Sequence, residues 1–251
     1  NEKQVKGLNI MEAVKLMRGK IGTPINITVR RLEVDEDLKF TIVRDVVKVR
    51  EVSSSILDNV GYLRLRAFNE QGSKQLIKKI NNFKKTKKDL NGYILDLRNN
   101  PGGLLSQAIK ITDLFLDSGE IVSTRGREKN DIKIYTARKG DILKGKPLII
   151  LINRGSASAS EIVSGALKDH KRAILLGEKT FGKGSVQSII PLKDKGAIRL
   201  TIAKYYLPSG TSISQIGVDP DITVKEKKEN FKINDKENDN QLQYALNLFK
   251  V

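Results

Sequence analysis

Two short segments of this 251-residue chain carry residue types suited to nucleophilic chemistry. Residues 153–161 read NRGSASASE and place Ser158 among small residues, and residues 180–187 read TFGKGSVQ and place Lys183 between two glycines. The chain has no Cys and a single His, which excludes a cysteine nucleophile, a disulfide and a thiolate metal site. A serine activated by a lysine remains open as a way to build a hydrolase.

The lysine motif has the features that a general base needs. A serine hydroxyl is a weak nucleophile until a base takes its proton, and a neutral lysine can be that base. A tight glycine turn after Phe181 would carry the Lys183 side chain inward beside apolar neighbours. Gln187 follows four residues later, where a strand would bring its amide close enough to hold the lysine rotamer, as the third group of a triad does.

The single histidine, His170, is poorly placed to act on Ser158. It falls at the far end of the helix that Ser158 would begin, and a helix of about eleven residues is roughly 17 Å long. We therefore expect His170 to be an ordinary surface or helix-end residue, and a Ser-His-Asp triad is disfavoured.

The serine motif also predicts how an oxyanion would be held. The apolar strand at 147–152 leads into the turn, and Ser158 would then stand at a helix start, where free backbone N–H groups favour negative charge. The N–H of Ala159 would be one donor. The second would come from the NPGG turn at 100–103, where Gly102 lets the backbone approach a substrate closely.

Each of these motifs has a plainer interpretation. Ser158 and Glu161 also fit a capping box, and Gly102 with Gly103 fits an ordinary turn. Residues 177–183 imitate a phosphate-binding loop, but Gly184 stands where a Ser or Thr would bind magnesium, and a strand rather than a helix is expected next.

The elements that must position these residues alternate in type along the chain. We expect strands at 24–29, 39–49, 61–66, 93–97, 147–152, 173–176, 186–192 and 197–206. Helices are expected from Asn9 to about Gly19, over a lysine-rich stretch at about 72–90, at 104–116, from Ser158 to about Lys168, and near the end of the chain. The repeated order of strand, turn and helix predicts a layered α/β core.

The net charge of +17 invites a nucleic-acid or anionic-membrane interpretation. The densest cluster lies in the lysine-rich helix, where Leu76, Ile80 and Phe83 recur at helical spacing. This pattern favours a helix with one buried stripe and a solvated lysine face over a nucleic-acid patch. Only 5% of the residues are aromatic, so platforms for stacking bases would be scarce and no nucleic-acid partner is expected.

Several motifs, taken in order, resemble the carboxyl-terminal processing peptidases, or tail-specific proteases, of peptidase family S41. They are DLRNNPGG at 96–103, GSASASE at 155–161, TFGKGSVQ at 180–187, LPSG at 207–210 and GVDPD at 217–221. The resemblance implies a crotonase-like or ClpP-like α/β core with a cap, spanning residues 33–251. Residues 1–32 resemble the second half of the PDZ domain that precedes this core, without the Gly-Leu-Gly-type loop that would hold a peptide carboxylate.

The resemblance implies a serine endopeptidase that works through an acyl-enzyme and needs no metal or other cofactor. Ser158 matches the family nucleophile, Lys183 the general base and Gln187 the residue that supports the lysine. Gly102 and Ala159 match the oxyanion-hole donors. Some descriptions of the family add an acidic residue where Asp169 falls, but we expect that residue to lie far from the serine and leave it out of the catalytic set.

The resemblance further implies protein or peptide substrates with accessible, apolar C-terminal tails. It implies an extracytoplasmic location, in a bacterial periplasm or cell envelope, with a signal peptide removed or the sequence a fragment. Peripheral membrane association and a homo-oligomer stay open. Two other functions are weighed against this one: a non-catalytic protein whose basic surface docks on anionic lipid or nucleic acid, and an acyl-CoA enzyme of the crotonase type.

Overall fold

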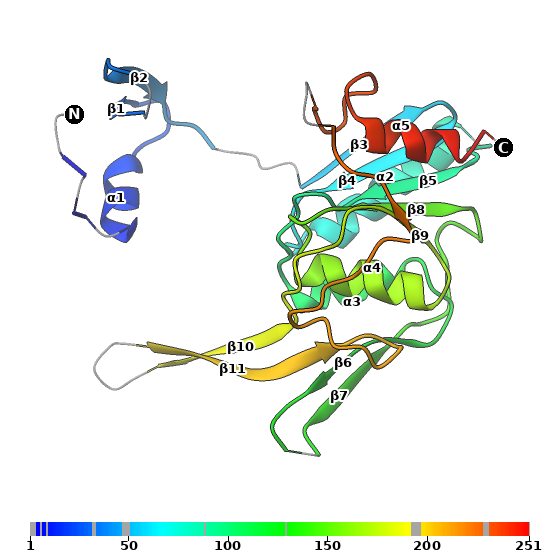
Figure 1. Cartoon of the computed structure of the whole chain (residues 1–251). Helices are drawn as coiled ribbons and strands as arrows, with labels where there is room; N and C mark the ends of the chain where they lie inside the picture. Colours follow the sequence, from blue (N-terminus) through cyan, green and yellow to red (C-terminus); the bar gives the residue numbers. More distant parts are fainter. Residues whose placement is uncertain are drawn as a thin grey trace. The chain divides into compact units, whose positions relative to one another are not determined.

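The computed structural model divides the chain into two compact units, Asn1–Arg50 (unit 1) and Glu51–Val251 (unit 2) (Figure 1). The structure describes residues 4–5, 7–8, 10–31, 34–46, 51–87, 89–128, 130–191, 197–227 and 231–250. Each unit is described by itself.

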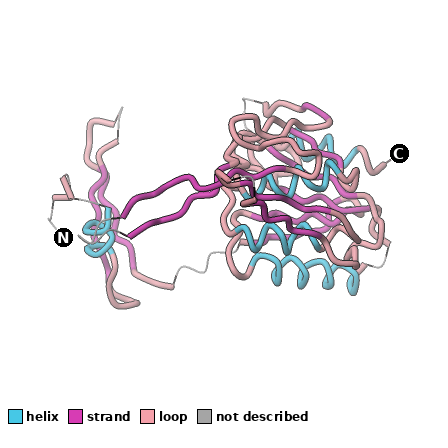
Figure 2. The backbone as a smooth tube through the Cα atoms, turned by 90° about the horizontal axis from the view of Figure 1, so that it is seen from below, coloured by secondary structure: helices cyan, strands magenta, loops and turns pink. Residues whose placement is uncertain are grey.

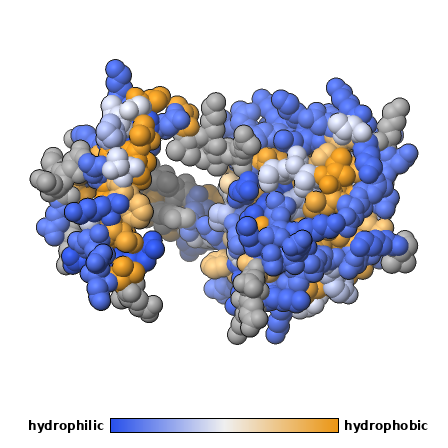
Figure 3. All heavy atoms as spheres, turned by 90° about the horizontal axis from the view of Figure 1, so that it is seen from above, coloured by the Kyte–Doolittle hydropathy of each residue, from blue (hydrophilic) through white to orange (hydrophobic). Residues whose placement is uncertain are grey.

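Unit 1 contains one helix and one two-stranded antiparallel sheet. The elements are α1 (Ile10–Met17), β1 (Pro24–Val29) and β2 (Leu38–Val43). The boundary expected at residue 32 falls between β1 and β2; because these strands pair with each other, the structural division comes later, after Arg50. Phe40 and Ile42 of β2 are 45% and 50% exposed, and apolar surface of unit 1 appears in orange in the smaller body of Figure 3.

Unit 2 is built on a six-stranded sheet with strand order β12-β9-β8-β5-β4-β3. The strands are β3 (Val52–Leu57), β4 (Val60–Leu65), β5 (Gly92–Asp96), β8 (Leu148–Ile152), β9 (Ile174–Gly177) and β12 (Ile222–Thr223). All neighbours are parallel except β3, which pairs antiparallel with β4 at one edge. β5 and β8 read GYILD and LIILI and are buried throughout, as strands covered on both faces must be.

Helices cover both faces of this sheet, which gives the layered α/β core that the sequence predicts (Figure 1). On one face α2 (Gly72–Thr86), α3 (Leu105–Asp113) and α4 (Ala159–Asp169) pack against alternate strand residues such as Leu95 and Ile150. On the other face α5 (Asn240–Asn247) packs against Ile94 and Leu151. The lysine-rich helix buries Leu76, Ile80 and Phe83, as its spacing predicts.

A second, antiparallel sheet in unit 2 has the order β10-β11-β6-β7. Its strands are β6 (Glu120–Arg125), β7 (Ile132–Thr136), β10 (Ser185–Pro191) and β11 (Ala197–Tyr206). Figure 2 shows β10 and β11 as a long two-stranded ribbon that projects from the layered core.

A buried arginine fixes α5 against the end of β5. Arg98 is 1% exposed and donates to the carboxylates of Asp96 and Asp239, with Nη2 at 2.6 and 2.7 Å, and Nη1 donates to Gln241 at 2.9 Å. Burial works to lower the pKa of Arg98, but the two carboxylates outweigh it and the pKa is raised overall. Asp239 also caps α5, since it accepts from the N–H of Leu242. The cluster therefore holds the chain in place directly before the NPGG turn.

Within the described part of the chain, no helix is both long enough and apolar enough to cross a membrane.

Candidate active site

The two turns that carry Gly102 and Ser158 meet at the carboxyl edge of the six-stranded sheet. β5 and β8 are adjacent parallel strands, so the turns that follow them lie side by side. The carbonyl oxygen of Asn100 accepts from the N–H of Ala157 at 3.0 Å and from the hydroxyl of Ser160 at 2.9 Å. These bonds join the serine turn to the NPGG turn.

Ser158 adopts an unusual backbone conformation at the start of α4. Its φ is 55° and its ψ is −111°, a region that a residue with a side chain rarely occupies. Such a conformation costs about 1–3 kcal/mol and is kept only where the surroundings enforce it, often at a functional site. It resembles the sharp strand-to-helix turn that exposes the nucleophile of α/β-hydrolases.

The capping interpretation of Ser158 is also correct, because it is the N-cap of α4 and its N–H donates to the Glu161 carboxylate at 2.8 Å. A cap role and a nucleophile role are therefore compatible in this residue.

Gly102 touches the serine turn so closely that no larger residue fits. Its φ is +98°, and a Cβ there would lie 2.6 Å from the Ala157 carbonyl oxygen, 2.9 Å from the Ala159 nitrogen and 2.9 Å from the Ser158 Cβ. Among the residues that the structure describes, the N–H of Ala159 donates to no acceptor. Gly102 therefore lies directly against Ser158 and the backbone nitrogen of Ala159 at the start of α4.

The N–H of Gly102 is already engaged in this structure. It donates to the side-chain oxygen of Asn100 at 2.9 Å, while the N–H of Gly103 has no acceptor in the described part of the chain. Gly102 would have to exchange Asn100 for an oxyanion before it could act as the second donor.

The lysine loop, which follows β9, is tied to the serine turn through one buried carboxylate. Glu161 is 0% exposed and accepts four hydrogen bonds. The donors are Ser158 N–H at 2.8 Å, Thr180 hydroxyl at 2.6 Å, Gly182 N–H at 2.6 Å and Lys183 N–H at 2.8 Å. The backbones of Ser158 and Lys183 therefore share one acceptor, and the N–H of Phe181 also donates directly to the carbonyl oxygen of Ser156 at 3.0 Å.

The sequence shows Glu161 only as a capping partner, and its bridging role was missed. Nothing in the local pattern separates a capping Glu from a bridging one, since the bridge requires the loop after β9 to pass the start of α4.

The side chains of Lys183 and Gln187 are both exposed. In the described part of the chain, the Lys183 ammonium makes no hydrogen bond to the Ser158 hydroxyl. Gln187 lies on β10, at a register irregularity between Val186 and Gln187. The structure thus brings the Lys183 backbone to the serine turn but records no contact of its amine with the hydroxyl.

Asp169 and His170 lie at the opposite end of α4 from Ser158. The Asp169 carboxylate accepts from the N–H of Ser209 at 2.9 Å, and His170 Nε2 donates to the carbonyl oxygen of Glu120 at 2.6 Å. Both side chains connect α4 to neighbouring segments, and the helix-end position predicted for His170 is confirmed.

Three large apolar side chains near the site are exposed. Leu104 follows the NPGG turn and is 44% exposed, and Phe181 in the lysine loop is 69% exposed. Ile216, which is 49% exposed, follows Gln215, whose N–H donates to the carbonyl oxygen of Gly182 at 2.8 Å. The surroundings of Ser158 therefore offer apolar surface to a ligand.

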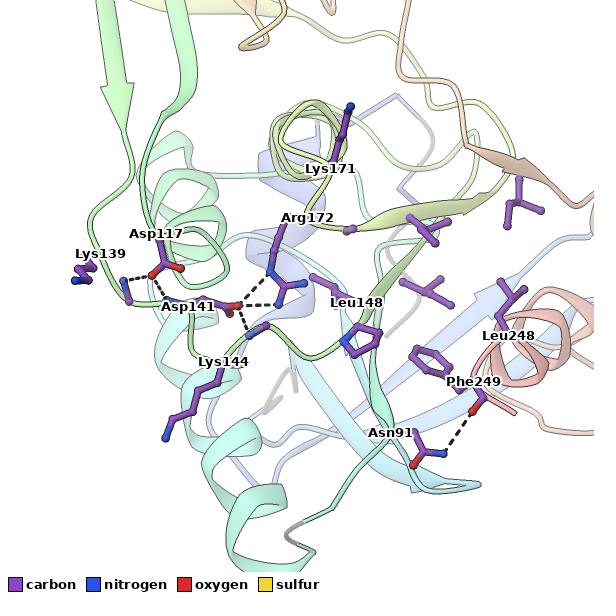
Figure 4. A pocket seen from close by; sticks show the side chains of 17 residues that line it. Asn91, Asp117, Lys139, Asp141, Lys144, Leu148, Lys171, Arg172, Leu248 and Phe249 are labelled. Atoms are coloured by element: carbon purple, nitrogen blue, oxygen red, sulfur yellow. Dashed lines mark hydrogen bonds and ion pairs between the residues drawn. The ribbon is translucent and has the colours of Figure 1, made fainter. Parts of the chain in front are cut away.

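A hollow of about 1210 Å³ lies elsewhere, against the first residues of β8 and β9 (Figure 4). Leu148 and Phe249 line its apolar part, and at its rim Arg172 pairs with Asp141 at 2.9 Å. The hollow adjoins the amino ends of β8 and β9, whereas the serine turn follows the carboxyl end of β8 and the lysine loop follows that of β9. The hollow is therefore separate from the site described above.

Comparison with known proteins gives a consistent result. Residues 59–224 match the model of Peptidase family S41. The chain is 56% identical over 227 residues to a "Carboxy-terminal-processing protease" of Bartonella bacilliformis, covering 89% of this chain and 52% of that protein. It is 38% identical over 223 residues to "Carboxy-terminal processing protease CtpA" of Bacillus subtilis, covering 88% of this chain and 47% of that protein.

Among solved structures, the "photosystem II D1 C-terminal processing protease" matches with a TM-score of 0.69 and 30% identity, covering 94% of this chain and 64% of that one. The chain spans about half the length of these curated relatives. The matched residues contain the NPGG turn, the serine turn and the lysine loop, and the chain belongs to peptidase family S41.

Proposed function

We propose that this chain carries the catalytic part of a serine endopeptidase that cleaves proteins near their C-terminal tails. The observation that carries the proposal is the Glu161 carboxylate, which binds the N–H groups of Ser158 and Lys183 at 2.8 Å each. The names of the relatives, which are carboxyl-terminal processing proteases, support the same reaction class. The exposed apolar residues around the serine support substrates with apolar tails.

The reaction begins when the Ser158 hydroxyl attacks the scissile carbonyl carbon and Lys183, as a neutral amine, takes the hydroxyl proton. The resulting oxyanion is held by the N–H of Ala159 and by Gly102, once Gly102 releases Asn100. Lys183 then returns the proton to the leaving amine, which leaves an acyl-enzyme on Ser158. A water molecule hydrolyses this ester with Lys183 as base. Gln187 holds the lysine rotamer as the amine moves toward the serine.

Since the described residues show no hydrogen bond from the Lys183 amine to the Ser158 hydroxyl, the amine would move to the hydroxyl when substrate binds. Catalytic hydrogen bonds are often long before substrate binds and tighten in the complex. We therefore assign the structure to a resting arrangement, in which the backbones are in place and the dyad is not yet formed.

Two further features belong to the proposal. Residues 1–32 contribute the second half of a PDZ domain, which α1 and β1 support. The protein works outside the cytoplasm, as the resemblance to bacterial processing peptidases implies.

The test is cleavage of an apolar-tailed peptide by purified protein and its variants. Ser158→Ala and Lys183→Ala should each lower kcat/KM by about 10³-fold or more, as loss of a nucleophile or its base does in other serine proteases. Ser209→Ala, which removes an exposed hydroxyl at the far end of α4, should leave the rate unchanged. Circular dichroism should show all variants folded.

Substantial cleavage by Ser158→Ala protein would overturn the proposal. No cleavage by any form, together with salt-dependent binding to anionic vesicles or nucleic acid, would instead favour the basic-surface binding protein.

A further inference from the structure

In the part of the chain that the structure describes, one edge of β10 pairs with no other strand, and the proposed reaction gives this free edge no role. β10 is the outermost strand in the order β10-β11-β6-β7, so within the described residues its second edge pairs with no strand. An unpaired edge presents a row of backbone N–H and C=O groups that an extended peptide can bind as an added strand.

This edge begins at the proposed site. β10 starts at Ser185, two residues after Lys183, and Glu161 ties the Lys183 backbone to that of Ser158. A peptide that pairs with the first residues of β10 would therefore have its backbone beside the serine turn. Figure 1 shows the strand running outward from this point along the ribbon.

The hydrogen-bond pattern shows which residues of β10 face outward. The carbonyl oxygen of Gly184 accepts from the N–H of Tyr205 at 2.8 Å, so Gly184 faces β11. Residues of an antiparallel strand face the partner alternately, which turns the N–H and C=O groups of Ser185, Gln187 and Ile189 toward the free edge. The register shifts between Val186 and Gln187, where Ile202 is an extra residue on β11, and from Gln187 to Pro191 the pairing is continuous. Because the extra residue lies on β11, the alternation along β10 itself is kept.

Pro191 supports this alternation of outward-facing residues and sets the length of the free edge of β10. It is the next outward position after Ile189, and a proline is tolerated in a sheet only where no N–H is needed. The usable edge thus runs from Ser185 to Ile190, which is about 20 Å at roughly 3.3 Å per residue and matches about six substrate residues.

The ribbon also offers side-chain contacts of the right chemistry. Ile190 pairs with Ile198 across the ribbon, and Leu200 lies two residues further along β11, so the three share one face. They are 43%, 49% and 50% exposed. An extended peptide with apolar residues at alternate positions would cover this face while its backbone pairs with β10.

From these observations we infer that the free edge of β10 binds the substrate as an added strand and leads its scissile bond to Ser158. The inference rests on the proposed function and names how the peptide is recognised. The proposed occupant of the free edge is an extended apolar segment of the substrate, not a second copy of this chain.

The first experiment is an N-methyl scan of a cleaved apolar peptide. A methyl on a backbone nitrogen removes a donor, so kcat/KM should fall by about tenfold at alternate residues on one side of the scissile bond and stay within about twofold between them. The two residues joined by the scissile bond are left unmodified. A profile without this period of two would overturn the inference, while Ser158-dependent cleavage of the unmodified peptide would leave the proposed function intact.

The second experiment removes a donor from the protein edge. Ile189→Pro takes away an outward N–H, and Ile189→Ala keeps it, so the first should raise KM by about tenfold relative to the second with little change in kcat. Equal KM values would contradict strand addition. The alternative occupant of the edge is a second copy of this chain, and analytical ultracentrifugation of both variants tests for it. If the Ile189→Ala protein is a dimer and the Ile189→Pro protein is a monomer, the edge binds a second copy and the inference is overturned.

Discussion

Both ends of α4 carry residue types that occur in catalytic triads, but the surroundings of these residues differ. At the amino end Ser158 has a φ of 55° and follows a turn of small residues, and Ala159 keeps an N–H without an acceptor among the described residues. At the carboxyl end Asp169 and His170 are both hydrogen-bonded to backbone groups of neighbouring segments. Ser, His and Asp are the residues of a familiar triad, yet one helix separates them by about 17 Å.

The two ends of α4 differ in the surroundings of their residues more than in the residue types. The amino end combines a strained backbone, a free N–H donor and close approach of Gly102, and these features cost stability. The carboxyl end shows saturated hydrogen bonds that connect α4 to the loop at Ser209 and to β6.

After loss of the nucleophile or of its base, the largest effect is expected from Gly102→Ala at the amino end. A Cβ there would come within 2.9 Å of the Ser158 Cβ and 2.6 Å of the Ala157 carbonyl oxygen, so the two turns must separate. Loss of one oxyanion donor costs about 10²–10³ in kcat, and we expect a fall in that range in steady-state peptide cleavage.

Gly210→Ala is the matched control for Gly102→Ala. Gly210 also has a positive φ, +81°, but a Cβ there meets nothing within 4 Å. It should lose about 1 kcal/mol of stability from backbone strain alone and keep its activity. If both variants lose activity equally, positive φ rather than crowding of the serine turn explains the loss.

Glu161→Ala should rank next, with a loss of about 10²-fold in kcat/KM. The change leaves four donors of the serine turn and lysine loop without their acceptor, and a displacement of about 1 Å near the reacting groups can cost that much. Glu161→Gln keeps one acceptor oxygen and should fall between the two proteins. Wild-type kcat/KM in Glu161→Ala would show that the shared carboxylate does not position the dyad.

Whether the sequence predicts a feature of this structure depends on how far apart along the chain the interacting residues lie. The helix from Ser158 to about Lys168 is found at Ala159–Asp169, because its apolar period and capping residues are local signals. Strands β6 and β7 were not predicted, since their mixed polar residues form strands only when paired. The helix expected at 104–116 is found at Leu105–Asp113, and Leu104 is its N-cap and is 44% exposed.

The candidate site shows the same difference between contacts that local patterns predict and contacts that depend on distant residues. Gly102 was predicted as the second donor beside Ser158, and the two residues are neighbours because the turns after the parallel strands β5 and β8 meet at one edge of the sheet. Glu161 was not predicted to join Lys183 to Ser158, because that contact depends on how the loop after β9 is held. Thr180 fixes this loop by accepting from the N–H of Val218 at 2.7 Å, a partner far along the chain that no local pattern indicates.

Asp169→Asn at the carboxyl end should have a small effect. The amide keeps an acceptor oxygen for the N–H of Ser209, so we expect stability within about 1 kcal/mol of wild type and kcat/KM within about threefold. Thermal unfolding and peptide cleavage measure the two quantities. A loss of 10²-fold or more in kcat, with stability unchanged, would mean that Asp169 influences the site and that the two ends of α4 are coupled.

The smallest effect on activity is expected from His170→Ala. The His170 ring bonds to the Glu120 carbonyl oxygen at 2.6 Å and packs against Gly119, so its loss should cost about 1 kcal/mol of stability. Because the ring lies a helix length from Ser158, kcat/KM and its pH profile should match wild type. A kcat/KM lowered 10³-fold in folded His170→Ala protein would restore histidine as the base. Wild-type kinetics would leave Lys183 as the remaining candidate from the sequence.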